Sequence, residues 1–170
     1  MKAKEAINYL NIKEHIKNPE VLDFTEQAIH LANEKFFTQP ASMTGKYHPE
    51  YSLGEGGLLR HTKAAIILAV ELFPLYGFED IEKDYIISAL TLHDIEKPDK
   101  LHPIMVKKLL LPVRRMSGGK TFKRVITLIE SHMGQWNLLG KLPVPIDEGQ
   151  KFVHLCDFLA SRKSIMVNIE

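Results

Sequence analysis

Apolar residues recur at helical spacing along almost the whole chain, and this pattern restricts the fold more than any other feature of the sequence. No segment alternates apolar and polar residues with the period of two that a half-buried strand shows. The helical pattern is clearest between residues 57 and 75, where one face carries Leu58, Ala65, Ile66, Ala69, Val70 and Phe73. We therefore expect an all-α fold, a compact bundle of about six or seven helices.

Local signals place these helices and the loops between them. Helices are expected at residues 3–17, 18–36, 57–75, 79–93, 103–116 with an interruption at Pro112, 120–132 and 147–163. Asn18 and Pro19 supply an N-cap and a first-turn proline for the second helix. Residues 38–57, with two prolines and four glycines, predict a long loop, and such loops are often functional. Residues 117–119 are expected to break the chain, and residues 142–145 to be extended.

Length and composition favour one globular domain. The chain has 170 residues, of which 45% are hydrophobic and 25% charged, and we expect a single domain over residues 1–170 with N-terminal helices in 1–37. Cys156 is the only cysteine, which excludes an intramolecular disulfide and an all-thiolate zinc site. No apolar stretch approaches the roughly 18 residues of a membrane span, and the polar N-terminus does not resemble a signal peptide. A cytoplasmic protein without membrane contact is the expectation.

The positive charges of the chain are concentrated in one block. Residues 100–129 contain eight lysines and arginines and no acidic residue, although the formal net charge of the whole chain is only +1. Such a block attracts phosphate-bearing ligands. We therefore expect Arg114 and Arg115 to bind substrate, with a nucleotide or a short single-stranded nucleic acid as the partner. The alternative is a solvated helix face whose cations happen to cluster.

A histidine and an aspartate stand side by side at the end of one apolar helix. Burying His93 and Asp94 there is costly unless something compensates them, and Asp157, in the middle of another apolar helix, raises the same question. The cations near them in sequence are Lys97 and Arg162. A divalent metal would compensate both carboxylates and also orient the imidazoles. Imidazole and carboxylate ligands suit Mn, Fe, Co, Ni or Zn.

Four short segments carry the histidines and aspartates in a fixed order. They read GGLLRHT, LTLHDIEKP, ESHMGQW and HLCDFLASR, and they lie within residues 46–163. This order resembles the signature of the HD-domain superfamily of metal-dependent phosphohydrolases: a helical histidine, a later His-Asp pair and a distal helical aspartate. The likeness is closest to the HD portion of bacterial exoribonucleases that join an OB-fold to an HD domain. No OB-fold is expected in these 170 residues.

The resemblance implies an enzyme that hydrolyses a phosphoester of a nucleotide or nucleic acid with one or two divalent ions. The ligands that it implies for the metal are His61, His93, Asp94 and Asp157. It implies catalytic roles for Asp94, Lys97 and His132: Asp94 would also accept a proton from water, and the other two would neutralise charge on the phosphoryl and leaving groups.

Further histidines complete the set that the resemblance implies. His102 and His132 would bind a second metal ion. His48 would be a further ligand or a substrate-binding residue, and His154, on the same helical face as Asp157, would orient that aspartate.

One departure from the family pattern leaves an alternative function open. Glu96 stands where the family often has glycine, and a carboxylate there could weaken anion binding. The chain would then be a metal-bound nucleotide sensor, or a nucleic-acid-binding accessory module with little or no turnover. Trp136, just after His132, could stack on a base in either nucleic-acid interpretation.

Overall fold

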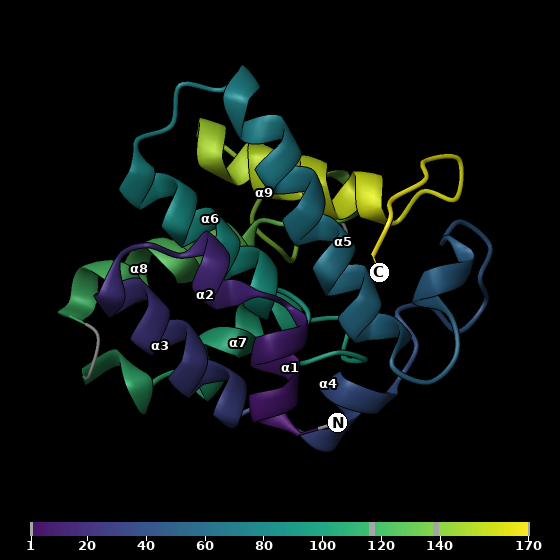
Figure 1. Cartoon of the computed structure of the whole chain (residues 1–170), viewed down its shortest axis with the longest axis horizontal. Helices are drawn as coiled ribbons and strands as arrows, with labels where there is room; N and C mark the ends of the chain where they lie inside the picture. The colour runs from purple at the N-terminus through teal and green to yellow at the C-terminus, as the bar shows by residue number, and fades with distance from the viewer. Residues whose placement is uncertain (1, 116–117, 138–139, 170) are drawn as a thin grey trace.

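The computed structural model describes residues 2–115, 118–137 and 140–169, and these residues form helices and loops only (Figure 1). The all-α fold is confirmed. The α-helices are α1 (Ala3–Tyr9), α2 (Ile12–His15), α3 (Pro19–His30), α4 (Glu34–Thr38), α5 (Gly57–Leu72), α6 (Asp80–Leu92), α7 (His102–Leu109), α8 (Gly118–Glu130) and α9 (Glu148–Ala160). Short 3-10 turns are η1 (Glu50–Ser52), η2 (Phe73–Leu75), η3 (Val113–Arg115) and η4 (Gly134–Trp136).

The described helices outnumber the six or seven expected because each of the two N-terminal helices is divided. Asn11 adopts a left-handed conformation with φ of +53° and separates α1 from α2, a conformation that asparagine tolerates better than most residues. Asn33 begins α4, and its side chain accepts a hydrogen bond of 2.8 Å from the backbone N–H of Lys35. The predictions of unbroken helices over 3–17 and 18–36 were therefore wrong. The predicted cap at Asn18 is confirmed.

The later helices lie close to their predicted places. The helix that begins at Asp80 and the one that begins at Glu148 match the expected ranges within a few residues, and α7 ends before Pro112 as expected. A break was predicted at residues 117–119. It was wrong for Gly118 and Gly119, because α8 begins at Gly118, and Ser117 lies outside the described residues. Across the described residues, no helix combines the length and the apolar character needed to cross a bilayer.

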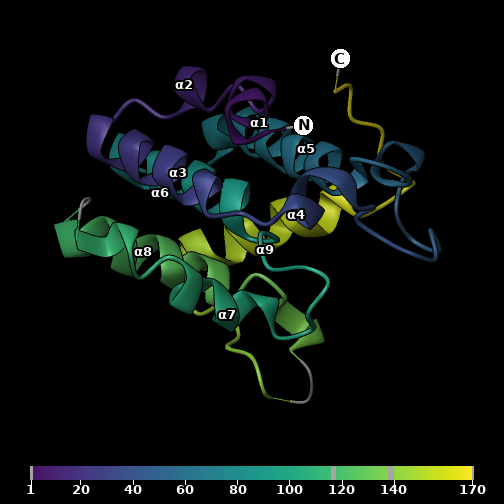
Figure 2. The same cartoon turned by 90° about the horizontal axis from the view of Figure 1, so that it is seen from below.

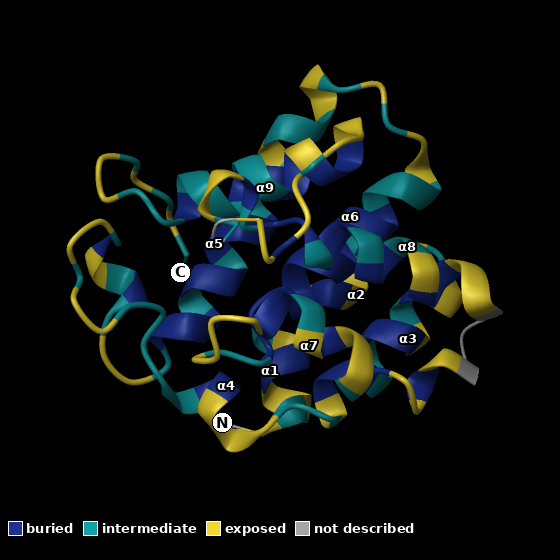
Figure 3. Cartoon of the chain, turned by 180° about the vertical axis from the view of Figure 1, so that it is seen from behind, coloured by how far each residue is buried: buried dark blue, intermediate teal, exposed yellow. Residues whose placement is uncertain are grey.

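Helix α6 is the centre of the bundle. It packs against α3, α5, α8 and α9, while α5 and α9 run side by side, and Figure 2 shows α7 and α8 along the opposite side from α3. Every residue from Asp84 to Leu92 is buried, which Figure 3 shows as dark blue at the core. A helix with neighbours on all sides must be apolar all round. This explains the continuous apolar run that precedes His93.

A buried carboxylate joins the N-terminal helices to α6. Asp84 accepts hydrogen bonds from the backbone N–H of Lys17 at 3.0 Å and of Asn18 at 2.7 Å, just before α3 begins. Those donors lie at a helix start and have no partner within the helix itself. One helical turn further along α6, Ser88 bonds to Thr25 at 2.7 Å. These contacts fix α3 against the helix that ends at the candidate site.

We expect Asp84→Ala to lower the free energy of unfolding by about 2 kcal/mol, because two partly buried backbone donors lose their buried partner. Urea unfolding would measure the change. Asp80→Ala is the matched control, since Asp80 begins the same helix and is almost fully exposed. Equal midpoints for the Asp84 variant and the unmodified protein would contradict this account.

Candidate metal centre

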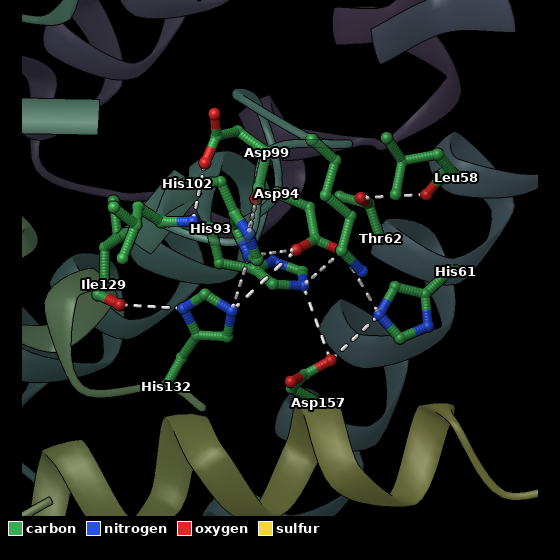
Figure 4. Close-up of polar contacts among 12 residues, drawn as sticks. Leu58, His61, Thr62, His93, Asp94, Asp99, His102, Ile129, His132 and Asp157 are labelled. Atoms are coloured by element: carbon green, nitrogen blue, oxygen red, sulfur yellow. Dashed lines mark hydrogen bonds and ion pairs between the residues drawn. The ribbon is translucent and has the colours of Figure 1, made fainter. Parts of the chain in front are cut away.

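Five helices bring six ionisable side chains to one place in the core (Figure 4). Helix α5 supplies one histidine, the end of α6 a His-Asp pair, the start of α7 and the end of α8 one histidine each, and α9 an aspartate. These residues are His61, His93, Asp94, His102, His132 and Asp157. The side chains are buried except that of Asp157, which is 18% exposed. We call this set the His/Asp cluster.

Three imidazoles of the cluster are oriented by backbone carbonyls. The Nδ1 atoms of His93, His102 and His132 lie 2.6 to 2.7 Å from the carbonyl oxygen three residues earlier in each case. A carbonyl oxygen only accepts, so Nδ1 carries the proton in each ring. The neutral form of each ring therefore has its lone pair on Nε2, the atom that faces the cluster.

The first group of donor atoms surrounds one oxygen of Asp94. Asp94 Oδ2 lies 3.3 Å from His93 Nε2 and 3.8 Å from His61 Nε2. Asp157 Oδ1 closes this group at 2.9 Å from His61 Nε2 and 3.5 Å from His93 Nε2. The structure thus brings together all four residues that the resemblance implies as ligands of one metal.

The second group surrounds the other oxygen of the same carboxylate. Asp94 Oδ1 lies 3.0 Å from His102 Nε2 and 3.8 Å from His132 Nε2. The two Nε2 atoms are 3.2 Å apart. Both are acceptors when the rings are neutral, so a proton or a cation must stand between them. Asp94 is shared by the two groups, and each of its oxygens faces one of them.

The atoms present fit a transition metal. His93 Nε2 and both carboxylate oxygens of Asp94 are buried without a well-formed hydrogen bond. Donor atoms that share one ion at about 2.1 Å lie roughly 3.0 to 3.5 Å from each other, close to the separations seen here. Converging lone pairs and anionic oxygens repel one another unless a cation compensates them. His61, His93, Asp94 and Asp157 could hold one ion, and Asp94 could share a second with the other two histidines.

Electrostatics in the cluster favour the same chemistry. Burial by itself would lower the pKa of His93, but the carboxylates of Asp94 and Asp157 raise it to about 10. Burial opposes ionisation of both aspartates, but the charges of His93 and Lys97 hold the pKa of Asp94, and hydrogen bonds with His61 and His93 hold the pKa of Asp157, well below the usual range. Burial and the charge of His93 lower the pKa of His132 to about 3. The carboxylates are thus ionised and His132 is neutral, and a metal would replace a proton on His93.

The side of the cluster that reaches solvent is bordered by His48 and Lys97. The side chain of Lys97 is 23% exposed, and its Nζ lies 2.6 Å from Asp94 Oδ2. Burial opposes the charge on this lysine, but Asp94 raises its pKa. The ring centre of His48 lies 5.8 Å from that of His61, and its Nδ1 is buried without a partner. Burial and the neighbouring His61 lower the pKa of His48 to about 4, so the ring is neutral.

Glycine at the start of α5 allows the long loop to carry His48 to this place. A Cβ on Gly57 would lie 2.3 Å from the carbonyl oxygen of Ser52, so no other residue fits there without a shift. The loop is also tied to the cluster through Gln39, whose side-chain amide donates to the carbonyl of Lys97 at 3.0 Å. The expected long loop is confirmed at residues 39–56, between α4 and α5, and it contains one 3-10 turn.

The two arginines expected to bind substrate lie away from the cluster. Arg114 and Arg115 belong to η3, next to the start of α8, whereas His132 follows the end of that helix. Thirteen residues of α-helix span about 20 Å. Arg124, in the same basic block, is engaged by ion pairs with Glu82 and Asp147.

Two other residues make contacts that the sequence did not indicate. His154 was expected to orient Asp157, but its Nδ1 lies 2.7 Å from the carbonyl oxygen of His132. The ring of His154 can lie this close to the turn after α8 because residue 134 is glycine: a Cβ on Gly134 would lie 2.3 Å from that ring. The glycine in SHMGQW was the signal that could have indicated this close contact. Arg162, a candidate partner of Asp157, instead lies over aromatic rings.

Comparison with known proteins gives one relative of described activity. A segment of 89 residues, half of this chain, is 38% identical to the dihydroneopterin 2',3'-cyclic phosphate phosphodiesterase of Methanocaldococcus jannaschii. The match covers 32% of that protein's length. No protein-family model matches this chain, and no solved structure matches it. The relative is a phosphodiesterase, which agrees with a phosphohydrolase but does not support the expected likeness to exoribonucleases.

We expect the purified protein to carry a transition metal, and His93→Ala and Asp157→Ala to lose most of it. Elemental analysis would measure the content. Chelation should also lower the melting temperature, because the ion compensates buried carboxylates in the folded state only. His30→Ala, at an exposed position on α3, is the control and should retain the metal. Unchanged metal content in both cluster variants would contradict the ligand assignment.

Proposed function

We propose that this chain is a metal-dependent phosphohydrolase of the HD-domain superfamily, folded as a single HD-type domain over residues 1–170. The observation that carries the proposal is the sharing of Asp94 between two groups of buried donor atoms. The order of the motifs, the all-helical fold and the similarity to a phosphodiesterase support it. The substrate is a phosphoester of a nucleotide or a related compound.

The first ion would be held by His61, His93, Asp94 and Asp157, and Asp94 would share a second with His102 and His132. Mn, Fe, Co, Ni and Zn all accept this mixture of imidazole and carboxylate ligands. When bound, such an ion supplies a Lewis acid for the phosphoryl oxygen and lowers the pKa of bound water from about 15.7 towards roughly 7.

The chain's own side chains would supply the remaining chemistry. The ammonium of Lys97, partly exposed at the open side, would donate to a phosphoryl oxygen and neutralise the charge that builds there. Asp94 would accept a proton from the attacking water, because its carboxylate is ionised. Neutral His132 would orient the phosphate or assist the leaving group from the second group of atoms.

The relative's activity narrows the class of substrate that we propose. The Methanocaldococcus jannaschii protein is named for a 2',3'-cyclic phosphate, which is a cyclic phosphodiester. We propose cyclic phosphodiesters of nucleotides, and short single-stranded nucleic acids second, as substrates of this chain. The distance of Arg114 and Arg115 from the cluster favours the smaller compounds, which need only Lys97 and one or two neighbours.

We expect Lys97→Ala to reduce kcat by about 100-fold while the metal content stays the same, because one charge-stabilising donor is lost from the transition state. Steady-state kinetics with elemental analysis would measure both quantities. Lys100→Ala, an exposed lysine in the same loop, should leave kcat within about twofold. A change in thermal stability without a change in kcat would make Lys97 a structural partner of Asp94.

A substrate panel tests the proposed function directly. The metal-loaded protein should hydrolyse 2',3'-cyclic mononucleotides faster than it hydrolyses short single-stranded oligonucleotides, and Asp157→Ala should abolish both activities. Phosphate release and chromatography of the products would distinguish a diesterase from a monoesterase. If the metal-loaded protein hydrolyses no member of a panel of nucleotides and oligonucleotides, the enzyme proposal is wrong and a sensor or accessory module replaces it.

A further inference from the structure

Arg162 lies among three aromatic rings just after α9 ends. The carbon at the centre of its guanidinium is 4.0 Å from the ring centre of Phe158, 5.2 Å from that of Trp136 and 5.6 Å from that of Tyr47. The rings of Trp136 and Phe158 also stack on each other at 5.5 Å with an angle of 16° between their planes. These contacts hold the guanidinium in a restricted orientation.

The hydrogen-bond donors of this guanidinium are not used. Cation–π contacts use no N–H donor, and a guanidinium has five of them in its plane. Among the described residues, no acceptor bonds to the guanidinium of Arg162, and its Nε is buried without a partner. The other arginines in the interior behave differently: Arg60 donates to the carbonyls of Tyr51 and Leu53, and Arg124 pairs with carboxylates. A partly buried cation with free donors is costly unless a ligand uses them.

The position of Arg162 relates it to the open side of the His/Asp cluster. Tyr47, one of its three rings, directly precedes His48, and Phe158, another, directly follows Asp157. The backbone N–H of Lys163 donates to the carbonyl of Tyr47 at 2.9 Å, which joins the end of the chain to the long loop. Next to these two segments lies a cavity of about 480 Å³ whose lining includes His48, Glu50 and Lys163; Arg162 does not line it but directly precedes Lys163.

The cavity has the size of a pocket for a small organic molecule, and His48, Glu50 and Lys163 are among the residues that line it. A substrate with one phosphate at the cluster would extend past His48 towards these segments. Aromatic contacts leave the N–H donors of a guanidinium available for an oxyanion, and arginine binds phosphate through two parallel hydrogen bonds.

We propose that Arg162 is a substrate-binding residue that recognises a second phosphate group, separate from the phosphate that is hydrolysed at the cluster. This inference rests on the proposed function for its catalytic readout. The class of substrate that it names is a nucleotide with two phosphate groups, such as a 2',3'-cyclic nucleotide that also has a 5'-phosphate. Tyr47, Trp136 and Phe158 position the guanidinium.

The kinetic test compares 2',3'-cyclic AMP with its 5'-phosphorylated form. The unmodified protein should have a KM at least about tenfold lower for the second compound, and Arg162→Gln should remove most of that difference by raising KM while kcat changes much less. Arg162→Lys keeps the positive charge but loses the pair of parallel N–H donors of the guanidinium, so it should retain part of the preference for the 5'-phosphorylated compound. Equal KM ratios in the unmodified protein and Arg162→Gln would overturn the proposal.

Lys46→Gln is the matched control, because Lys46 is an exposed cation whose Nζ lies 5.0 Å from the centre of the same Tyr47 ring. It should keep the preference for the 5'-phosphorylated compound. If it loses as much as Arg162→Gln, a general attraction of anions to this surface explains the preference and the assignment fails. Thermal unfolding of each variant separates loss of binding from loss of folding.

A binding test needs no turnover. Trp136 is the only tryptophan of the chain, so its fluorescence reports on the group that lies against it. In metal-stripped protein, inorganic phosphate should produce a saturable change in this fluorescence that Arg162→Gln abolishes. An identical response in both proteins would overturn the assignment. If the protein hydrolyses no nucleotide but shows the Arg162-dependent response, the proposed activity fails while the anion site stands.

Discussion

The carboxylate of Asp94 is the group on which the arrangement of the core depends. It is buried, it is ionised, and each of its two oxygens faces a different set of imidazole nitrogens. Burying an isolated carboxylate in such a place would reduce the stability of the fold by several kcal/mol. The bundle therefore folds around Asp94 only if cations or hydrogen-bond donors surround it. Lys97 supplies one cation at 2.6 Å. The remaining lone pairs face one another, and a metal ion could satisfy them.

This requirement explains why the helices meet where they do. The second half of helix α6 is buried on every side and ends at Leu92, so the polar cluster begins at His93, where the buried run of the helix stops. The backbone carbonyls at the ends of α6 and α8 have no partner within their helices. The carbonyl of Leu90 accepts from the ring of His93, and that of Ile129 accepts from both the backbone N–H and the ring of His132; the bonds to the rings turn the Nε2 atoms inward. Helix termination and ligand orientation thus depend on the same contacts.

The sequence predicted the helical fold and the members of the cluster, because both depend on local patterns and on residue types that are costly to bury. The period of the apolar residues indicated α5, α6 and α9, and the motif order indicated which histidines and aspartates would meet. It did not predict the break at Asn11, where one residue's backbone conformation overrides the apolar period. It also missed the partner of His154, because a hydrogen bond to the carbonyl of His132 depends on how α9 packs against the turn after α8.

The positive charges are a further case in which the structure differs from what the sequence predicted. The block at residues 100–129 predicted anion binding from the number of its cations, yet Arg124 is paired with carboxylates from two other parts of the chain, and Arg114 lies near the far end of α8 from His132. A charged side chain can bind the substrate only where its hydrogen-bond donors are free and it lies near the reacting group. Arg162 lies outside that block: its guanidinium has no acceptor among the described residues, and two of its aromatic neighbours, Tyr47 and Phe158, adjoin His48 and Asp157 in sequence. The proposal for Arg162 therefore moves substrate recognition from the basic face of α8 to the loop and the residues that follow α9.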